Sequence, residues 1–100
     1  MLHIVNRSPF ERTNLESCLL RAAKGSAILL YEDAVYAALG NTSFAPRMAE
    51  AATQFEIYVL QPDLAVRGVA ETPLVPGIRT VDYGGFVDLT AQKGAVQSWP

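Results

Sequence analysis

The stretch AILLYEDAVYAALG, residues 27–40, decides the fold class of this chain. It opens on an unbroken apolar run, residues 27–31, which is typical of a strand buried on both faces of a sheet. Two carboxylates, Glu32 and Asp33, follow at once, in the position where the start of a helix favours negative charge. Residues 32–39 therefore predict a short helix, and GNTS (40–43) ends it. A buried strand that leads directly into a helix is the unit from which α/β sheets are built.

The same alternation continues on both sides of this stretch. Further strands are predicted over LHIV (2–5), EIYVL (56–60) and IRTVDY (78–83). Helices are predicted over residues 8–23, 45–54 and 84–92, with a proline-initiated turn or short helix over 61–68, a loop over 69–77 and a tail over 94–100. Parallel strands need such crossovers, so we expect one α/β domain, residues 1–100, with a small, mainly parallel sheet and helices on both faces.

The helix predicted after the first strand carries a local start signal. Ser8 is placed as the N-cap, Pro9 as the first helical residue, and Glu11 three residues after Ser8. This spacing is that of a capping box, with proline where a helix tolerates it best. We therefore expect the helix to begin at Ser8 and to run to about Ala23, with Gly25 just beyond its end.

Composition and charge exclude several classes of function. The formal net charge is −2 and the basic residues are scattered, which argues against direct nucleic-acid binding because that needs a basic face. No apolar run approaches the length of a membrane span, and the first ten residues do not resemble a secretion signal. A single cysteine forms no internal disulfide, as expected in a reducing compartment. We therefore expect a cytoplasmic protein that does not bind membranes.

Motifs for metals and cofactors are missing from the sequence. The single histidine and single cysteine leave no pair with metal-ligand spacing. There is neither a GxGxxG after a strand nor a GxxxxGK[ST] phosphate loop. We expect no metal and no cofactor, and we interpret His3 as a hydrogen-bonded structural residue, since buried polar groups are normally satisfied. A role for His3 as the base of a catalytic triad is the less favoured reading.

Three carboxylates and two aromatic residues each allow both a functional and a structural interpretation. Glu32, Asp33 and Asp82 follow predicted strands, at the sheet edge where α/β proteins form their sites. They could serve acid–base chemistry, but capping of helices and solvated charge is the favoured interpretation. For Tyr36 and Trp99, burial in the core and exposure at a subunit interface are equally compatible with the sequence.

Cys18 is the candidate for a catalytic nucleophile. It lies at the edge of an apolar stripe formed by Leu15, Leu19 and Ala22 on the predicted helix. Such an edge suits a half-buried thiol at a groove, which a reactive cysteine needs. It equally suits an inert packing residue, because free cysteine is among the most buried residue types.

Four blocks of the sequence, in order along almost the whole chain, resemble the DsrH/TusB family of sulfur-relay subunits. They are MLHIVNRSPF (1–10), YEDAVYAAL (31–39), YVLQPDLAVRG (58–68) and VDYGGFVDLT with VQSW (81–90 and 96–99). The resemblance implies a DsrE-like domain with a flavodoxin-like arrangement. It also implies a heterohexamer with DsrE/TusD-like and DsrF/TusC-like chains.

The resemblance further implies a sulfurtransferase complex that passes persulfide sulfur between protein cysteines. The principal cysteine is expected on the DsrE/TusD-like partner. A TusA-like donor and a DsrC/TusE-like acceptor would serve it, either in sulfur oxidation or in 2-thiolation of the tRNA wobble uridine. Because DsrH-type chains resemble this one in carrying a cysteine after SPFE and LES, the sequence favours the DsrH side, with Cys18 as a candidate persulfide carrier.

Two alternatives compete with a working Cys18. In the first, this chain is a non-catalytic structural subunit of the same complex, and Cys18 only packs. In the second, outside the family, the chain is a stand-alone flavodoxin-like domain that binds a small ligand with the carboxylates at its strand ends.

Overall fold

A computed structural model describes all residues, 1–100, and shows a five-stranded, wholly parallel sheet. The strands are β1 (Leu2–Val5), β2 (Ala27–Leu30), β3 (Glu56–Leu60), β4 (Arg79–Val81) and β5 (Val96–Trp99), in the spatial order β4-β3-β2-β1-β5. The helices are α1 (Asn14–Arg21), the 3₁₀ helix η1 (Glu32–Ala38), α2 (Ala45–Ala51), α3 (Gln61–Val66) and α4 (Tyr83–Lys93). The predicted α/β class and the parallel sheet are confirmed.

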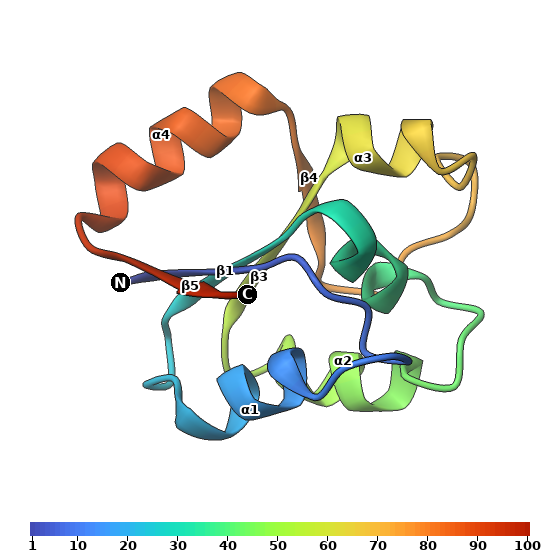
Figure 1. Ribbon diagram of the computed structural model, residues 1–100, viewed down its shortest axis with the longest axis horizontal. Coiled ribbons are helices and arrows are strands. Elements are labelled where there is room, and N and C mark those ends of the chain that lie inside the picture. Colours follow the sequence, from blue (N-terminus) through green and yellow to red (C-terminus); the bar gives the residue numbers. More distant parts are fainter.

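The helices cover the two faces of the sheet unequally. Figure 1 shows α1 and α2 on one side of the strands and α4 on the other, with both chain termini near the β1–β5 edge. The main core forms on the α1–α2 side and contains 19 buried residues, among them Val5, Ile28 and Val59. The smaller core under α4 contains four buried residues: Leu2, Ala27, Leu29 and Leu89. Alternate residues of the strands supply the two cores, as the two-residue period of a strand requires.

The central strand β2 is buried along its whole length, as residues 27–30 predict. The proline-rich stretch 69–77 is irregular, as predicted, and is tied to the end of η1 by an isolated antiparallel bridge between Leu39 and Leu74. The Val75 N–H donates to the Ala38 carbonyl oxygen at 2.8 Å beside this bridge. The loop therefore closes the carboxyl-terminal side of the main core.

The predicted helix start at Ser8 is wrong. Ser8 organises a turn: its hydroxyl accepts from the Phe10 N–H at 3.2 Å and its carbonyl oxygen accepts from the Arg12 N–H at 3.0 Å. The helix begins only at Asn14. Thr13 and Asn14 are weak helix formers, which explains why the turn does not continue into α1. The capping pattern marked a real turn, but it did not mark the first turn of the helix.

The expected tail, residues 94–100, contains the edge strand β5, which sequence reasoning missed. β5 pairs in parallel with β1, and Val5 lies opposite Trp99. Its residues are mostly exposed, so it lacks the apolar run that identified the inner strands. Both apolar residues of this segment, Val96 and Trp99, favour a packed position, but only Trp99 packs against the main core, whereas Val96 is 45% exposed.

Candidate functional site

Cys18 lies on the inner face of α1 and is 0% exposed. It belongs to the main core together with its helix neighbours Leu15 and Leu19. Burial raises the pKa of the Cys18 thiol to about 12, so the thiolate is scarce near neutral pH. A persulfide transfer needs an ionised and reachable sulfur, and the folded chain provides neither at Cys18.

His3 and Trp99 form a hydrogen bond across the β1–β5 pair. The Trp99 indole N–H donates to His3 Nδ1 at 3.2 Å, so that nitrogen carries a lone pair and the imidazole is neutral. Burial, with a smaller contribution from the N-terminal ammonium, lowers the pKa of His3. The interpretation of His3 as a hydrogen-bonded structural residue is confirmed. The same bond explains why Trp99 is directed inward.

The carboxylates of Asp33 and Asp82 and the backbone of Glu32, which follow the strands, are engaged in local structure. The Asp63 carboxylate accepts from the Glu32 N–H at 2.6 Å, where Glu32 has a φ of 48°. Asp33 forms an ion pair with Arg67 at 2.9 Å. Asp82 accepts from the Gly85 N–H at 2.7 Å and caps α4. These contacts support the interpretation of Asp33 and Asp82 as structural charges.

Tyr36, one of the two aromatic residues for which core and interface were both possible, lies in η1, is half-buried and packs against the main core. Trp99 is partly buried against the same core. Phe86 packs against the smaller core, to which Leu89 of the same helix belongs. Among the aromatic side chains, Tyr83 on α4 is the most exposed at 61%.

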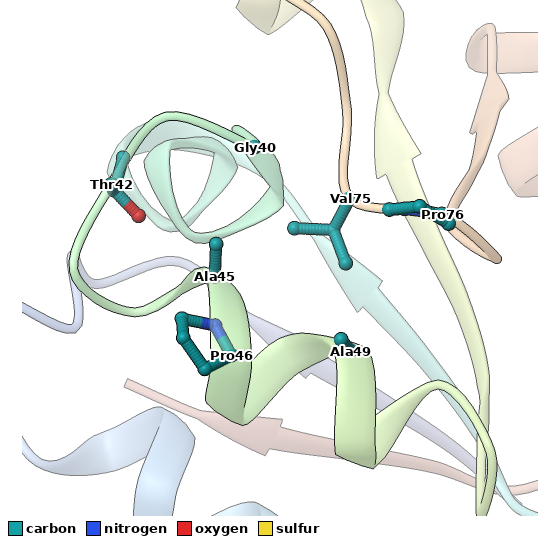
Figure 2. Close-up of a pocket in the computed structure, with 7 residues that line it drawn as sticks. All are labelled: Gly40, Thr42, Ala45, Pro46, Ala49, Val75 and Pro76. Carbon is teal, nitrogen blue, oxygen red and sulfur yellow. The ribbon is translucent and has the colours of Figure 1, made fainter.

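A shallow pocket of about 370 Å³ lies between α2 and the loops that flank it. Figure 2 shows the short side chains of Ala45, Pro46 and Ala49 on one wall and Val75 with Pro76 on the other. Thr42 contributes the only hydroxyl of the lining, and no acid, base or thiol faces the pocket. The pocket therefore has a shape for apolar contact but no group for catalysis.

No candidate metal centre is present elsewhere in the structure. No group of three His, Cys, Asp or Glu side chains is arranged to hold a metal ion. No helix is both long enough and apolar enough to cross a membrane. The second pocket, of about 200 Å³, lies at the sheet edge and is lined by seven residues that include Tyr58 and Arg79. Sequence reasoning did not single out these two residues, because the tyrosine and the arginine lie 21 positions apart and only the β3–β4 register brings them together.

Comparison with solved structures supports the fold. The crystal structure of the ychN protein from E. coli superimposes with a TM-score of 0.78 at 18% identity, over 97% of both chains. A protein of unknown function from Methanobacterium thermoautotrophicum superimposes with a TM-score of 0.69 at 13% identity, over 97% of this chain and 95% of that chain. At these identities the likeness concerns the fold alone.

Comparison with protein sequences identifies the family. The model of the DsrH like protein family matches residues 7–96. Protein TusB of Buchnera aphidicola is 33% identical, and Protein TusB of Erwinia tasmaniensis is 34% identical; each alignment covers 99% of this chain and all of the relative. Protein TusB of Pectobacterium parmentieri is 32% identical over the same share of both chains. The match therefore extends over the whole domain, and the chain belongs to the DsrH/TusB family.

Proposed function

We propose that this chain is a subunit of a sulfurtransferase complex that relays persulfide sulfur between protein cysteines. The observation that carries the proposal is the full-length match to the family, which covers residues 7–96 in the family model and 99% of the chain in the TusB relatives. The partners are a DsrE/TusD-like chain and a DsrF/TusC-like chain in a heterohexamer, with a TusA-like donor and a DsrC/TusE-like acceptor. The complex acts in the cytoplasm.

Within this complex we assign the chain a structural role, with the principal cysteine on the DsrE/TusD-like partner. In each transfer a thiolate attacks the outer sulfur of a persulfide, the new S–S bond forms, and the donor leaves as a thiolate. Cys18 is 0% exposed and its pKa is raised to about 12, which disfavours it for this attack. Cys18 as a persulfide carrier is thus the second candidate, and it requires a partner chain to open the α1 side of the core.

The name of the curated relatives favours transfer toward 2-thiolation of the tRNA wobble uridine over sulfur oxidation. The sequence favours the DsrH side only through Cys18. Because Cys18 is buried in the core, its presence is explained by packing and gives no functional argument for the DsrH side. The two directions differ in the acceptor, so a complex loaded with sulfur should pass it to a TusE-like protein and ultimately to tRNA.

Native mass spectrometry of the protein purified gently from its host tests this proposal. We expect this chain together with two related chains, and one extra sulfur atom, removable by dithiothreitol, on the DsrE/TusD-like chain alone. Extra sulfur on this chain would instead support Cys18 as a carrier. A monomer without partners, or one that binds a small metabolite, would contradict the relay proposal and favour the stand-alone ligand-binding domain.

A further inference from the structure

The second pocket lies where the edge strand β4 is shorter than its neighbour. β4 pairs only with residues 58–60, so the first part of β3 has no strand on that side. The pocket, of about 200 Å³, is lined by Ala52, Phe55, Glu56, Ile57, Tyr58, Gly77 and Arg79. Small-molecule sites generally occupy about 300–1,000 Å³, so this volume suits a single side chain better than a cofactor.

The register of the sheet brings together charged side chains that line this pocket or contact its lining. Tyr58 and Arg79 lie directly opposite each other, and paired residues of neighbouring strands share a face. Glu56 lies two residues before Tyr58 on the same face and accepts from the Tyr58 hydroxyl at 2.9 Å. Lys93, at the end of α4, forms an ion pair with Glu56 at 3.1 Å.

Glu56 is therefore already satisfied by its neighbours. The hydrogen bonds from Lys93 and Tyr58 lower the pKa of Glu56, and burial together with the bond to Glu56 raises the pKa of Tyr58. The Tyr58 hydroxyl thus remains protonated and keeps donating to the carboxylate. Lys93 is thus the close ionic partner of Glu56, whereas Arg79 acts on that carboxylate only as a more distant charge and forms no ion pair of its own.

Arg79 differs from the other basic residues in where it lies. Three of the eight basic side chains form ion pairs in this chain: Arg47, Arg67 and Lys93. Of the remainder, only Arg79 lines a pocket. The local balance is two cations against one carboxylate, which complements one further carboxylate.

We propose that this pocket receives the carboxylate of an aspartate or glutamate side chain of a partner subunit, with Arg79 as its main ligand. A guanidinium binds a carboxylate through two parallel hydrogen bonds, which suits a subunit contact of fixed geometry. The place is an open sheet edge, where proteins commonly pair with other chains. The inference rests on the proposed function, because that function supplies the related partner chains.

The test compares Arg79→Gln with Arg12→Gln in the complex purified from its host. Both changes remove one positive charge from an exposed side chain, but Arg12 lies in the turn before α1, and the one hydrogen bond of its side chain goes to the neighbouring Glu11 carbonyl oxygen. We expect Arg79→Gln to raise the dissociation constant of the complex about tenfold or more, since one partner of an interface charge pair is lost. Arg12→Gln should leave it unchanged, and Arg79→Lys should give an intermediate value.

Dissociation would be followed by native mass spectrometry and analytical ultracentrifugation, with thermal unfolding of each isolated variant as the check on folding. Equal dissociation constants for wild type, Arg79→Gln and Arg12→Gln would overturn the proposal. Equal weakening by both glutamine variants would overturn it as well, because the effect would then be one of net charge.

A second measurement separates failure of this inference from failure of the proposed function. If the wild-type protein has no partner chain, the isolated protein is titrated with sodium acetate, against sodium chloride of equal ionic strength, and followed by NMR at the Arg79 Nε–H. A saturable acetate-specific shift supports a carboxylate pocket even though the relay proposal has failed. The absence of such a shift overturns the pocket.

Discussion

At the scale of the residue, burial decides what the single cysteine and the single histidine do. Cys18 and His3 are, respectively, 0% and 6% exposed. Burial disfavours the charged form of each, so the thiol stays protonated and the imidazole stays neutral. From sequence alone, a cysteine and a histidine are both possible catalytic residues. In the structure, Cys18 packs in the core and His3 accepts a hydrogen bond from Trp99.

Cys18 is predicted to resist alkylation while the chain is folded. At pH 8 iodoacetamide should modify it only at the rate at which the protein opens, because both thiolate formation and access are suppressed. The rate should rise sharply in urea above the unfolding midpoint. Rapid modification in native buffer, followed by intact-mass measurement, would contradict the packing role.

Two substitutions of Cys18 test the apolar surroundings of the thiol. Cys18→Ala should lower the free energy of unfolding by about 1–2 kcal/mol through the small cavity it leaves. Cys18→Ser keeps a side-chain volume closer to that of cysteine but buries a hydroxyl in an apolar site. It should therefore lower the free energy of unfolding by at least as much as Cys18→Ala. Urea unfolding curves of both variants give the comparison, and a Ser variant as stable as wild type would indicate a polar site.

The His3–Trp99 pair predicts a pH dependence of stability. The pKa of His3 is lowered in the folded chain, whereas in the unfolded chain it lies near 6.5. Below that value the unfolded state binds more protons, so the stabilisation is complete above about pH 6.5 and is lost as the pH falls through the folded pKa. The imidazolium also cannot accept from the Trp99 indole.

Urea unfolding between pH 7 and pH 5, followed through the fluorescence of the single tryptophan, measures this dependence. His3→Gln, which does not titrate, is the control and should remove the part of the slope due to His3. An unchanged slope in that variant would assign the pH dependence to the carboxylates instead.

At the scale of the element, the best-predicted segments are those whose sequence pattern is dictated by burial. β2 is buried on both faces and reads as an unbroken apolar run, so its residues alone identify it. β5 has one partner strand and mostly exposed residues, so nothing in VQSW distinguishes it from a tail. The start of α1 was misplaced because Ser8 and Pro9 favour a turn as strongly as a helix.

The same distinction between local pattern and tertiary packing applies to the residues of the candidate site. Asp82 was interpreted correctly because capping is a local interaction between neighbours in sequence. The burial of Cys18 and the pocket beside Arg79 depend on which elements pack together, and local pattern does not determine that. Sequence reasoning therefore identified the capping carboxylate but not the sheet-edge pocket.

The cap of α4 predicts a measurable loss of stability. Asp82→Ala removes the acceptor for the Gly85 N–H and should lower the free energy of unfolding by about 1 kcal/mol. Asp88→Ala, at an exposed position inside the same helix, is the matched control and should change it by less than about 0.5 kcal/mol. Thermal unfolding followed by circular dichroism compares them, and equal losses would show that general charge, not the cap, is responsible.

At the scale of the whole molecule, the two cores differ greatly in size. The α1–α2 side holds 19 buried residues, whereas the α4 side holds four. Tyr83 and Val87 on the outer surface of α4 are 61% and 62% exposed. A chain of this length buries a limited share of its surface alone, so association with related chains would add stability that the single domain lacks.

The structural role of this chain, with Cys18 as packing, is tested most directly by the rate of sulfur transfer through the complete complex that carries Cys18→Ala. The rate would be followed as labelled sulfur passing from a TusA-like donor to a TusE-like acceptor, with complex composition checked by native mass spectrometry. If Cys18 only packs, we expect a rate equal to that of wild type, whereas a cysteine substitution in the DsrE/TusD-like partner should abolish transfer. Loss of transfer in an intact Cys18→Ala complex would contradict the structural role and establish Cys18 as a working thiol.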